Sequence, residues 1–223
     1  MRRTVLLTST IVALAATPVA AQVVSLDEGS FTLYRDGERI GREDFSIRSA
    51  PAADGRILVA QATQAVGQRR TAPGVSADTG GFPVRYQREV REGGTVIESY
   101  SGQASRDRYS SLLRHADGES AREFRLAAGT VAADDDIVHQ LWFIARRGAG
   151  ATVPVLVPQR NVVESIRVER VGTERLSIDL RQFETVRLAL RGPAGSLREL
   201  WIGPDGRIIK ASIPALRLIA LRD

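Results

Sequence analysis

Residues 84–94 read VRYQREVREGG, and this stretch decides the fold because it joins a strand pattern to a turn. Apolar and polar residues alternate along it, so one face of the predicted strand is mostly apolar and the other is solvent-exposed. Arg88 interrupts the apolar face. Gly93-Gly94 then supplies the backbone freedom that a tight hairpin turn requires. This combination is typical of antiparallel sheets with one solvated face.

The same combination recurs along the chain. Four further turn dipeptides separate segments of strand-like pattern, namely Asp36-Gly37, Asp54-Gly55, Asp117-Gly118 and Asp205-Gly206. The pattern predicts strands over residues 30–36, 39–48, 56–66, 83–92, 95–103, 106–115, 119–127, 162–171, 174–181, 184–191, 197–202 and 207–213. Because sheet twist accumulates, this many strands are expected to curl into a barrel, a half-barrel or two layers.

One segment has a helical period instead, residues 134–147, DDDIVHQLWFIARR. Its three aspartates are expected to cap the first turn, its two terminal arginines suit the negative end of the helix dipole, and Gly148 ends it. One apolar stripe is expected to complete the core, while His139 and Phe143 lie four apart on a second side. The predicted fold is therefore mainly β: a single large curved antiparallel meander, half-barrel or barrel-like, with one helix packed on it.

Two connections complete the predicted domain. Residues 71–81 are rich in Gly and Ala and are expected to form a loop, and residues 148–159, with two prolines, are expected to return from the helix in an extended form. No composition shift marks a domain boundary, so residues 22–223 are predicted to form one β-rich domain.

The N-terminus is predicted to be a signal peptide, residues 1–21. Arg2 and Arg3 precede a short apolar run, and Val19-Ala20-Ala21 offers small residues for cleavage before Gln22. The run is shorter than the about 20 residues that a membrane span needs, and no later segment approaches that length. We therefore expect an exported protein, periplasmic or secreted, without an integral membrane span.

Composition narrows the function. The chain has no cysteine, which excludes disulfides, thiol nucleophiles and cysteine-based metal sites. It has 31 Lys+Arg against 26 Asp+Glu, and without Arg2 and Arg3 the balance is 29 against 26. This small excess is spread along the strands, whereas nucleic-acid binding requires a clustered basic face, so we expect no nucleic-acid partner.

The sequence carries no catalytic motif, and a non-enzymatic role is favoured. Asp135 and His139 lie four apart, but two ligands are too few for a closed metal site, so no metal, cofactor or catalytic residue is predicted. Ser76 and Asp78 lack the strand-turn-helix context of a serine elbow, and no phosphate-binding glycine loop is present. Paired carboxylates that meet only in space leave no mark in a sequence, and that class of hydrolase stays open.

Two stretches carry a resemblance. GSFTLYRDGERIGREDFSI at 29–47 and ELWIGPDGRIIKASIPALRLIALRD at 199–223 resemble the opening hairpin and closing strands of uncharacterised bacterial secreted proteins with long antiparallel meanders. These are in turn similar in architecture to periplasmic lipoprotein carriers, in which a half-barrel covered by helices shelters acyl chains. The resemblance implies a lipid or another hydrophobic small molecule as ligand.

Two functional hypotheses follow. In the first, the sheet curls around a groove closed by the helix that binds a hydrophobic ligand, with His139, Trp142, Phe143, Tyr86 and Tyr100 as ligand-binding residues. In the second, the helix fills the groove and the protein is a non-catalytic cell-envelope interaction or structural module that acts through its polar strand faces. Core packing is the competing interpretation for the aromatic residues, with Phe143 beneath the 71–81 segment. The sequence leaves the oligomeric state open.

Overall fold

The computed structural model describes residues 22–106 and 108–223, so the segment predicted to be a signal peptide lies outside the described residues. The described residues form a 15-stranded sheet with one α-helix and three 3₁₀ turns. The elements are β1 (Val24–Arg35), β2 (Glu38–Ala52), β3 (Gly55–Val66), β4 (Arg69–Asp78), β5 (Pro83–Glu92), β6 (Thr95–Ser105), β7 (Arg108–His115), β8 (Gly118–Phe124), β9 (Val131–Ala132), α1 (Leu141–Ala145), β10 (Thr152–Val157), η1 (Pro158–Arg160), β11 (Val162–Ile178), β12 (Arg181–Arg191), η2 (Pro193–Gly195), β13 (Leu197–Ile202), β14 (Ile208–Ile213), η3 (Pro214–Leu216) and β15 (Leu218–Arg222).

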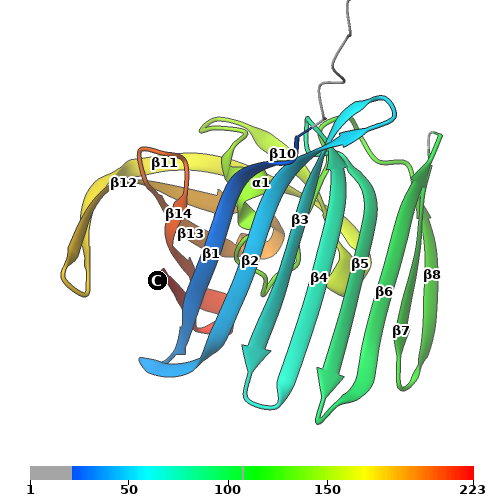
Figure 1. The fold of residues 1–223 in the computed structure, drawn as a ribbon, viewed down its shortest axis with the longest axis horizontal. Coiled ribbons are helices and arrows are strands. Elements are labelled where there is room, and N and C mark those ends of the chain that lie inside the picture. The colour runs from blue at the N-terminus through cyan, green and yellow to red at the C-terminus, as the bar shows by residue number, and fades with distance from the viewer. Residues whose placement is uncertain (1–21, 107) are drawn as a thin grey trace, which may run out of the picture.

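The sheet is a meander whose first and last strands pair. Its order is β8-β7-β6-β5-β4-β3-β2-β1-β15-β14-β13-β12-β11-β10-β9, and the pairs are antiparallel except β9 with β10. In Figure 1 the strands β1 to β8 form the front wall, β10 to β14 lie behind them, and α1 lies between the two walls. The two end strands, β8 and β9, do not pair with each other in the described sheet. The prediction of one curved, half-barrel-like meander with a single packed helix is confirmed.

Successive side chains of each strand point alternately to the inner and the outer face of the sheet. On β5, Tyr86, Arg88 and Val90 are buried, whereas Arg85 and Gln87 are exposed. Arg88, which interrupts the apolar pattern in the sequence, is therefore an inner residue, only 2% exposed. Cross-strand register continues this inner face, since Arg88 pairs with Pro73 on β4 and with Tyr100 on β6.

The Asn161 side chain bridges the open side of the sheet. Asn161, which follows η1, is buried and accepts a 2.7 Å hydrogen bond from the Ser111 hydroxyl on β7. Its amide donates to the backbone oxygen of Ser120 on β8 at 3.3 Å. The positive φ of Asn161, 52°, is one that asparagine tolerates better than most residues. This seam links β7 and β8 to the connection between β10 and β11, on the side where the described sheet is not closed by backbone pairing.

The helix is much shorter than predicted. Only residues 141–145 are α-helical, and the preceding residues form turns. Within this described segment, α1 has no side-chain cap and no acidic residue in its first turn, so the predicted capping by Asp134 to Asp136 is wrong. Their carboxylates instead face partners elsewhere in the fold, and Gln140 Oε1 accepts from the Asp134 backbone N–H at 2.7 Å. Tertiary hydrogen bonds replace the intrahelical ones.

Two further expectations are corrected. The 71–81 segment is mostly strand β4, which pairs with β3 and β5, because its alternate residues Thr71, Pro73, Val75 and Ala77 are buried despite the Gly and Ala content. The predicted strands 162–171 and 174–181 are one strand, β11, with a register shift at Arg170/Gly172. A β-bulge absorbs the extra residue without ending the strand.

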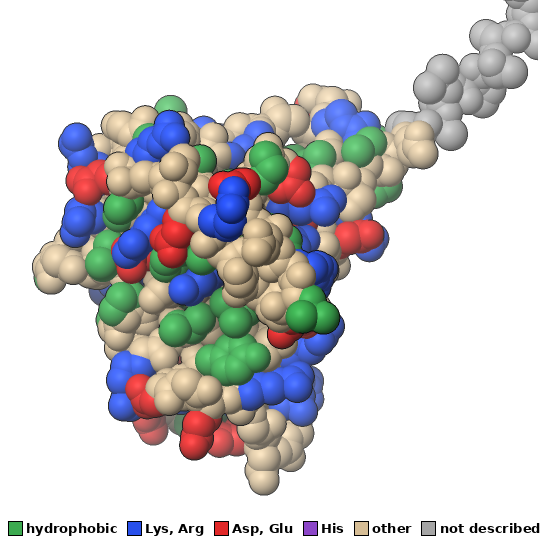
Figure 2. All heavy atoms as spheres, turned by 90° about the vertical axis from the view of Figure 1, so that its left-hand side faces the viewer, with side chains coloured by type: hydrophobic (Ala, Val, Ile, Leu, Met, Phe, Trp, Pro, Cys, Tyr) green, Lys and Arg blue, Asp and Glu red, His purple; other side chains and the backbone are tan. Residues whose placement is uncertain are grey.

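The far ends of β11 and β12 carry a small second core. Leu176 and Ile178 pack with Trp201 and Ile209, whereas Leu180, which continues the sequence alternation, lies in the turn and is fully exposed. The Trp201 ring is covered by Lys210 at 4.3 Å and by Arg187 at 5.1 Å. Figure 2 shows the side of the molecule on which this hairpin lies, with hydrophobic side chains gathered between charged ones.

Candidate functional site

Three proline-initiated 3₁₀ turns gather at one end of the half-barrel, near the β1–β2 and β3–β4 turns. They are η1, η2 and η3, which begin at Pro158, Pro193 and Pro214. Each contains or precedes a non-glycine residue with positive φ: Asn161, Ala194 and Arg217. Such conformations are costly and cluster at functional sites, so this end of the molecule is a candidate site.

The first hollow here, which we call the mouth pocket, has a volume of about 420 Å³. Its apolar lining comes from strands that meet at this end and from η3, namely Leu33, Ile40, Val66, Leu216 and Leu218. Its polar lining is Arg35, Gln64, Arg69, Asp135, Asp136 and Gln159. The pocket is therefore amphipathic, with apolar walls and carboxylate and guanidinium groups beside them.

A second hollow of about 280 Å³, the side pocket, lies next to the mouth pocket. Asp135 and Leu216 line both, so they form the partition between the two. The remaining lining is mostly apolar and is Pro193, Ala194, Ser196, Leu197, Ile213 and Ala215, with Arg160, Glu164 and Arg198 as its charged members. All three 3₁₀ turns contribute to these two walls.

Asp135 is the centre of an ion-pair network at the boundary between the mouth pocket and the side pocket. Its Oδ2 lies 2.7 Å from Arg160 Nε, and its Oδ1 pairs with Arg198 Nη2. Arg160 Nη2 lies 2.6 Å from Glu164 Oε2. The hydrogen bond to Asp135 is the largest cause that raises the pKa of Arg160, so this guanidinium stays charged.

Behind the mouth pocket lies a buried charge cluster around Arg88. Its Nη1 is 3.0 Å from Asp134 Oδ2 and 3.6 Å from Asp136 Oδ1, and its Nε is 3.2 Å from Glu98 Oε1. Burial opposes the charged form of Arg88, but the three carboxylates together raise its pKa. Burial raises the pKa of Asp136 to about 6, with Asp134 and Glu43 adding to the rise and Arg88 opposing it.

Glu43 anchors the turn that carries these aspartates. It is fully buried on β2 and accepts backbone hydrogen bonds from Val138 at 3.0 Å and His139 at 2.8 Å. It also lies 2.9 Å from His139 Nδ1 and accepts from Gln64 at 3.2 Å. One carboxylate thus fixes the chain just before α1, and it positions Asp135 and Asp136 at the pocket.

The predicted ligand-binding residues lie in the interior. His139 is buried with its ring stacked on Phe45 at 5.7 Å, and Tyr86 donates to Asp134 at 2.6 Å and accepts from Gln140. Figure 1 places α1, which carries the other two helix candidates, inside the walls.

The structure brings these candidates together in two aromatic pairs. The Tyr86 and Tyr100 rings meet edge to face at 5.7 Å, and those of Trp142 and Phe143 at 5.1 Å. All four contribute to the main hydrophobic core, Trp142 from a half-buried position. Burial raises the pKa of Tyr86 far above its usual range and that of Tyr100 to about 12, so both phenols stay protonated.

Sequence reasoning missed the residues that line the mouth and side pockets. The sequence does mark some of these residues, because Pro158, Pro193 and Pro214 each follow a strand pattern. In the structure, each of these prolines begins a 3₁₀ turn at the same end of the fold. The charged members gave no such sign, because Asp135, Arg160 and Arg198 come from distant positions and meet only in space.

Across residues 22–106 and 108–223, no group of three or more His, Asp or Glu side chains is placed to hold a metal ion. In the same part of the chain, the helices lack the length and apolar character needed to cross a membrane.

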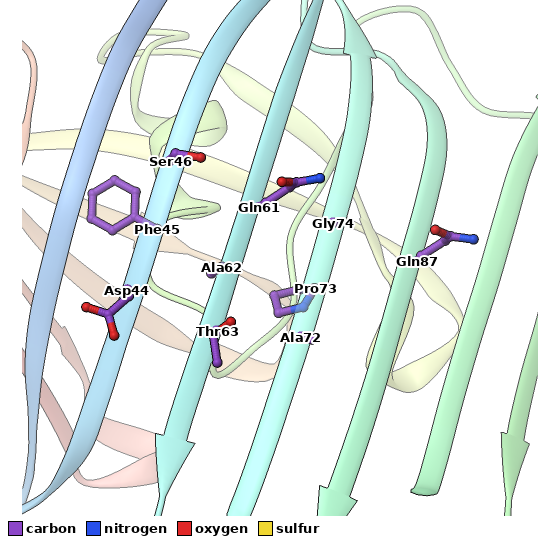
Figure 3. A pocket seen from close by; sticks show the side chains of 10 residues that line it. All are labelled: Asp44, Phe45, Ser46, Gln61, Ala62, Thr63, Ala72, Pro73, Gly74 and Gln87. Carbon is purple, nitrogen blue, oxygen red and sulfur yellow. The ribbon is translucent and has the colours of Figure 1, made fainter.

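A shallow hollow of about 520 Å³ lies on the outer wall over β2 to β5. Ser46, Gln61, Gly74 and Gln87 follow one another across these strands in register. Figure 3 shows the hollow's lining, with Phe45 directed to the opposite side from Gln61 and Gln87. This face is polar and mostly uncharged at its centre.

Fold and pockets define the class of protein: an antiparallel, barrel-like β protein with a plugged interior and a hollowed end. No protein-family model and no curated protein matches this chain. Among solved structures, it is similar to a β-barrel-like protein of the domain of unknown function DUF1849 from Brucella abortus, with a TM-score of 0.56 and 10% identity. The match covers 92% of this chain and 98% of the other. At this level of identity, the match shows the fold alone.

Proposed function

We propose that the protein is exported and binds a small amphipathic molecule, such as a lipid, in the mouth pocket. The observation that carries the proposal is the pocket itself, an amphipathic hollow of about 420 Å³ framed by turns of the sheet. Its volume falls in the range of about 300 to 1,000 Å³ that is usual for small-molecule sites. Its walls offer both apolar surface and charged groups, which is the chemistry an amphipathic ligand requires.

The ligand is placed at the mouth and not beneath the helix. Phe143 and Ile144 of α1 are buried in the main core together with Val131 and Tyr86, so the helix plugs the space between the walls. The mouth pocket keeps half-exposed apolar side chains at Ile40 and Val66. Each ligand methylene that these side chains remove from water contributes about 0.8 kcal/mol.

Export is part of the same proposal. Arg2 and Arg3, the apolar run after them and the small residues before Gln22 support cleavage and transport out of the cytoplasm. Expression of the full sequence in a bacterium, followed by cell fractionation and intact-mass measurement, tests it. A protein that starts at Gln22 in the periplasm or the medium is expected, and an uncleaved cytoplasmic chain would count against export.

Dye titration tests the pocket. A neutral naphthylamine dye that fluoresces in apolar surroundings is expected to bind the wild-type protein, and Val66→Trp, which fills the pocket, is expected to weaken binding about tenfold or more, equivalent to 1.4 kcal/mol. Val59→Trp is the matched control, since Val59 is another half-buried valine of β3, outside the lining of the mouth pocket. Absence of binding by the wild type, or equal binding by Val66→Trp, overturns the proposal.

The outer hollow supports a second candidate, an envelope interaction module that acts through its polar strand faces. Gly74 leaves the centre of this face open, and an added Cβ there would meet only the Gln61 side chain, at 3.9 Å. Gly74→Arg should therefore fold while placing a bulky charge in the hollow. Under this candidate, Gly74→Arg loses retention on isolated cell envelopes but keeps dye binding. Unchanged retention rules the outer hollow out as the interaction surface.

A further inference from the structure

The side pocket contains a buried cation whose hydrogen bonds are incomplete. Arg198 on β13 is 6% exposed and pairs with Asp135 through Nη2. Its Nε and Nη1 are buried and have no hydrogen-bond partner among the described residues. A guanidinium presents five N–H donors, and burial without partners is unfavourable, so this side of Arg198 has unused capacity for an acceptor.

Asp135 is the group that neutralises this cation. It belongs to the turn at residues 135–136, its side chain is 23% exposed, and it bridges Arg198 and Arg160. It is also the charged residue that lines both pockets. A carboxylate in this position has access to solvent on one side and to two guanidinium groups on the other.

We propose, on the basis of the proposed function, that Asp135 is an internal counter-ion that the ligand's acidic group displaces. The ligand class is then an anionic amphiphile, an apolar chain with a carboxylate or phosphate head. The head pairs with Arg198 and Arg160 in the side pocket, and the chain passes Leu216 into the mouth pocket. Arg198 and Arg160 are the specificity-determining residues.

Charge balance favours this exchange. Arg160 and Arg198 face Asp135 and Glu164, two positive groups against two negative ones. A ligand carboxylate that replaces Asp135 keeps this balance, and Asp135 turns to water at the partially exposed partition. One ion pair is exchanged for another, so no buried charge is left alone, which is the costly alternative.

The apolar surroundings determine where the chain of the ligand lies. Leu197, Ile213 and Leu216 line the side pocket next to Arg198, and Leu216 continues into the mouth pocket. A neutral alcohol with the same chain would gain the apolar contacts but would leave Arg198 with Asp135. The preference for an acid over an alcohol therefore reports on Arg198 and not on hydrophobic burial.

Isothermal titration with four ten-carbon probes tests the inference: decanoate, decyl phosphate, decanol and decyltrimethylammonium. The wild type is expected to bind an anionic probe about tenfold or more tightly than decanol, because a charged head group forms charge-assisted hydrogen bonds with the arginines that the alcohol does not form. The comparison of decanoate with decyl phosphate shows which head group is preferred. Arg198→Gln is expected to lose the preference for anions while retaining decanol binding.

Asp135→Asn provides the sharper comparison, because the inference predicts that this variant gains affinity for anions. Removal of the internal counter-ion frees both arginines, so anion affinity is expected to rise severalfold, while decanol affinity stays the same. Asp36→Asn is the matched control, since Asp36 pairs with Arg217 at 2.9 Å beside η3 but does not line either pocket. If Arg198→Gln fails to fold, Asp135→Asn decides alone.

The outcomes separate the inference from the proposed function. If neither anionic probe binds the wild type more tightly than decanol, or if Asp135→Asn shows no gain of anion affinity, the role of Asp135 is overturned but the mouth pocket remains a binding site. Preference for decyltrimethylammonium overturns the proposed charge of the ligand. Absence of binding by all four probes overturns the inference and the proposed function together.

Discussion

At the residue scale, Arg88 is a large charged side chain that lies in the interior of the fold. Its side chain is fully buried between Glu98, Asp134 and Asp136, in a low-dielectric interior where an isolated charge is strongly disfavoured. The carboxylates compensate for burial, and Arg88 in turn permits three negative groups to lie close together. The sequence marks Arg88 only as an interruption of an apolar alternation, because its partners lie on β6 and in the turn before α1.

Removal of the Arg88 charge is expected to be severe. Arg88→Met should lower the free energy of unfolding by about 3 to 5 kcal/mol, because it leaves buried carboxylates without their counter-ion. Urea unfolding at pH 7 measures the loss. Arg85→Met is the matched control on the exposed face of β5 and should change stability by less than about 0.5 kcal/mol. Equal effects of the two substitutions would contradict the buried-charge account.

Asp136 should make stability depend on pH. Its folded pKa of about 6 lies above the usual value of 3.8, so the folded state holds the proton more tightly than the unfolded state does. This contribution is fully present below about pH 4 and is lost as pH rises through 6, with a total of about 3 kcal/mol. The free energy of unfolding of Asp136→Asn, measured in urea, should therefore rise by about that amount relative to that of the wild type when the pH is raised from 4 to 7.5. Parallel pH profiles of the two proteins would contradict this assignment.

At the element scale, the segment before α1 is held by β2 and not by helical hydrogen bonds. Glu43 accepts from the Val138 and His139 amides and from the Gln64 side chain. A helix propensity is weak compared with such buried, charge-assisted bonds. The segment therefore forms turns up to residue 140, although its sequence has a helical period.

Glu43→Gln tests this anchor. An amide retains the shape but offers one acceptor oxygen in place of two, so it leaves an amide N–H of the segment without a partner. We expect a loss of about 2 kcal/mol in stability and faster hydrogen exchange at residues 137–145. Asp44→Asn, on the exposed face of the same strand, should leave exchange in this segment unchanged. Unaltered exchange in Glu43→Gln would show that other contacts fix the segment.

Elements differ in how far the sequence predicts them. The hairpins at Gly37 and at Gly93-Gly94 are local features, because alternation and positive φ suffice to specify them, and the structure confirms them. Strand β4 was missed because its small residues weaken the apolar–polar alternation in the sequence. In the fold, the segment is a strand because it pairs with β3 and β5. The two pockets were missed because their linings come from distant parts of the chain. The mouth pocket combines residues of β1 to β4 and β15 with η1 and η3, and the side pocket combines residues of β11, β13 and β14 with all three 3₁₀ turns.

At the scale of the whole molecule, a side chain bridges the open side of the half-barrel. Asn161 links the segment after η1 to β7 and β8, where backbone pairing between the described end strands is lacking. The pairing of β1 with β15 joins the two halves on the other side. The pocket-bearing end thus depends on contacts between distant parts of the chain.

The seam can be tested without a change in backbone strain. Asn161→Gly keeps the positive φ but removes the amide, so we expect a loss of about 1 to 2 kcal/mol and faster hydrogen exchange in β7 and β8. Asn161→Ala should lose more, because alanine disfavours this φ. If glycine behaves like the wild type, the side-chain bridge contributes nothing to closure.

The central claim is that a ligand occupies the mouth pocket while the helix fills the interior. Native mass spectrometry of protein purified without detergent after expression of the full sequence tests it most directly. A small amphipathic adduct is predicted on the wild type and on Val59→Trp, and its loss is predicted on Val66→Trp. An adduct that persists on Val66→Trp, or its absence from all three proteins, would contradict the account.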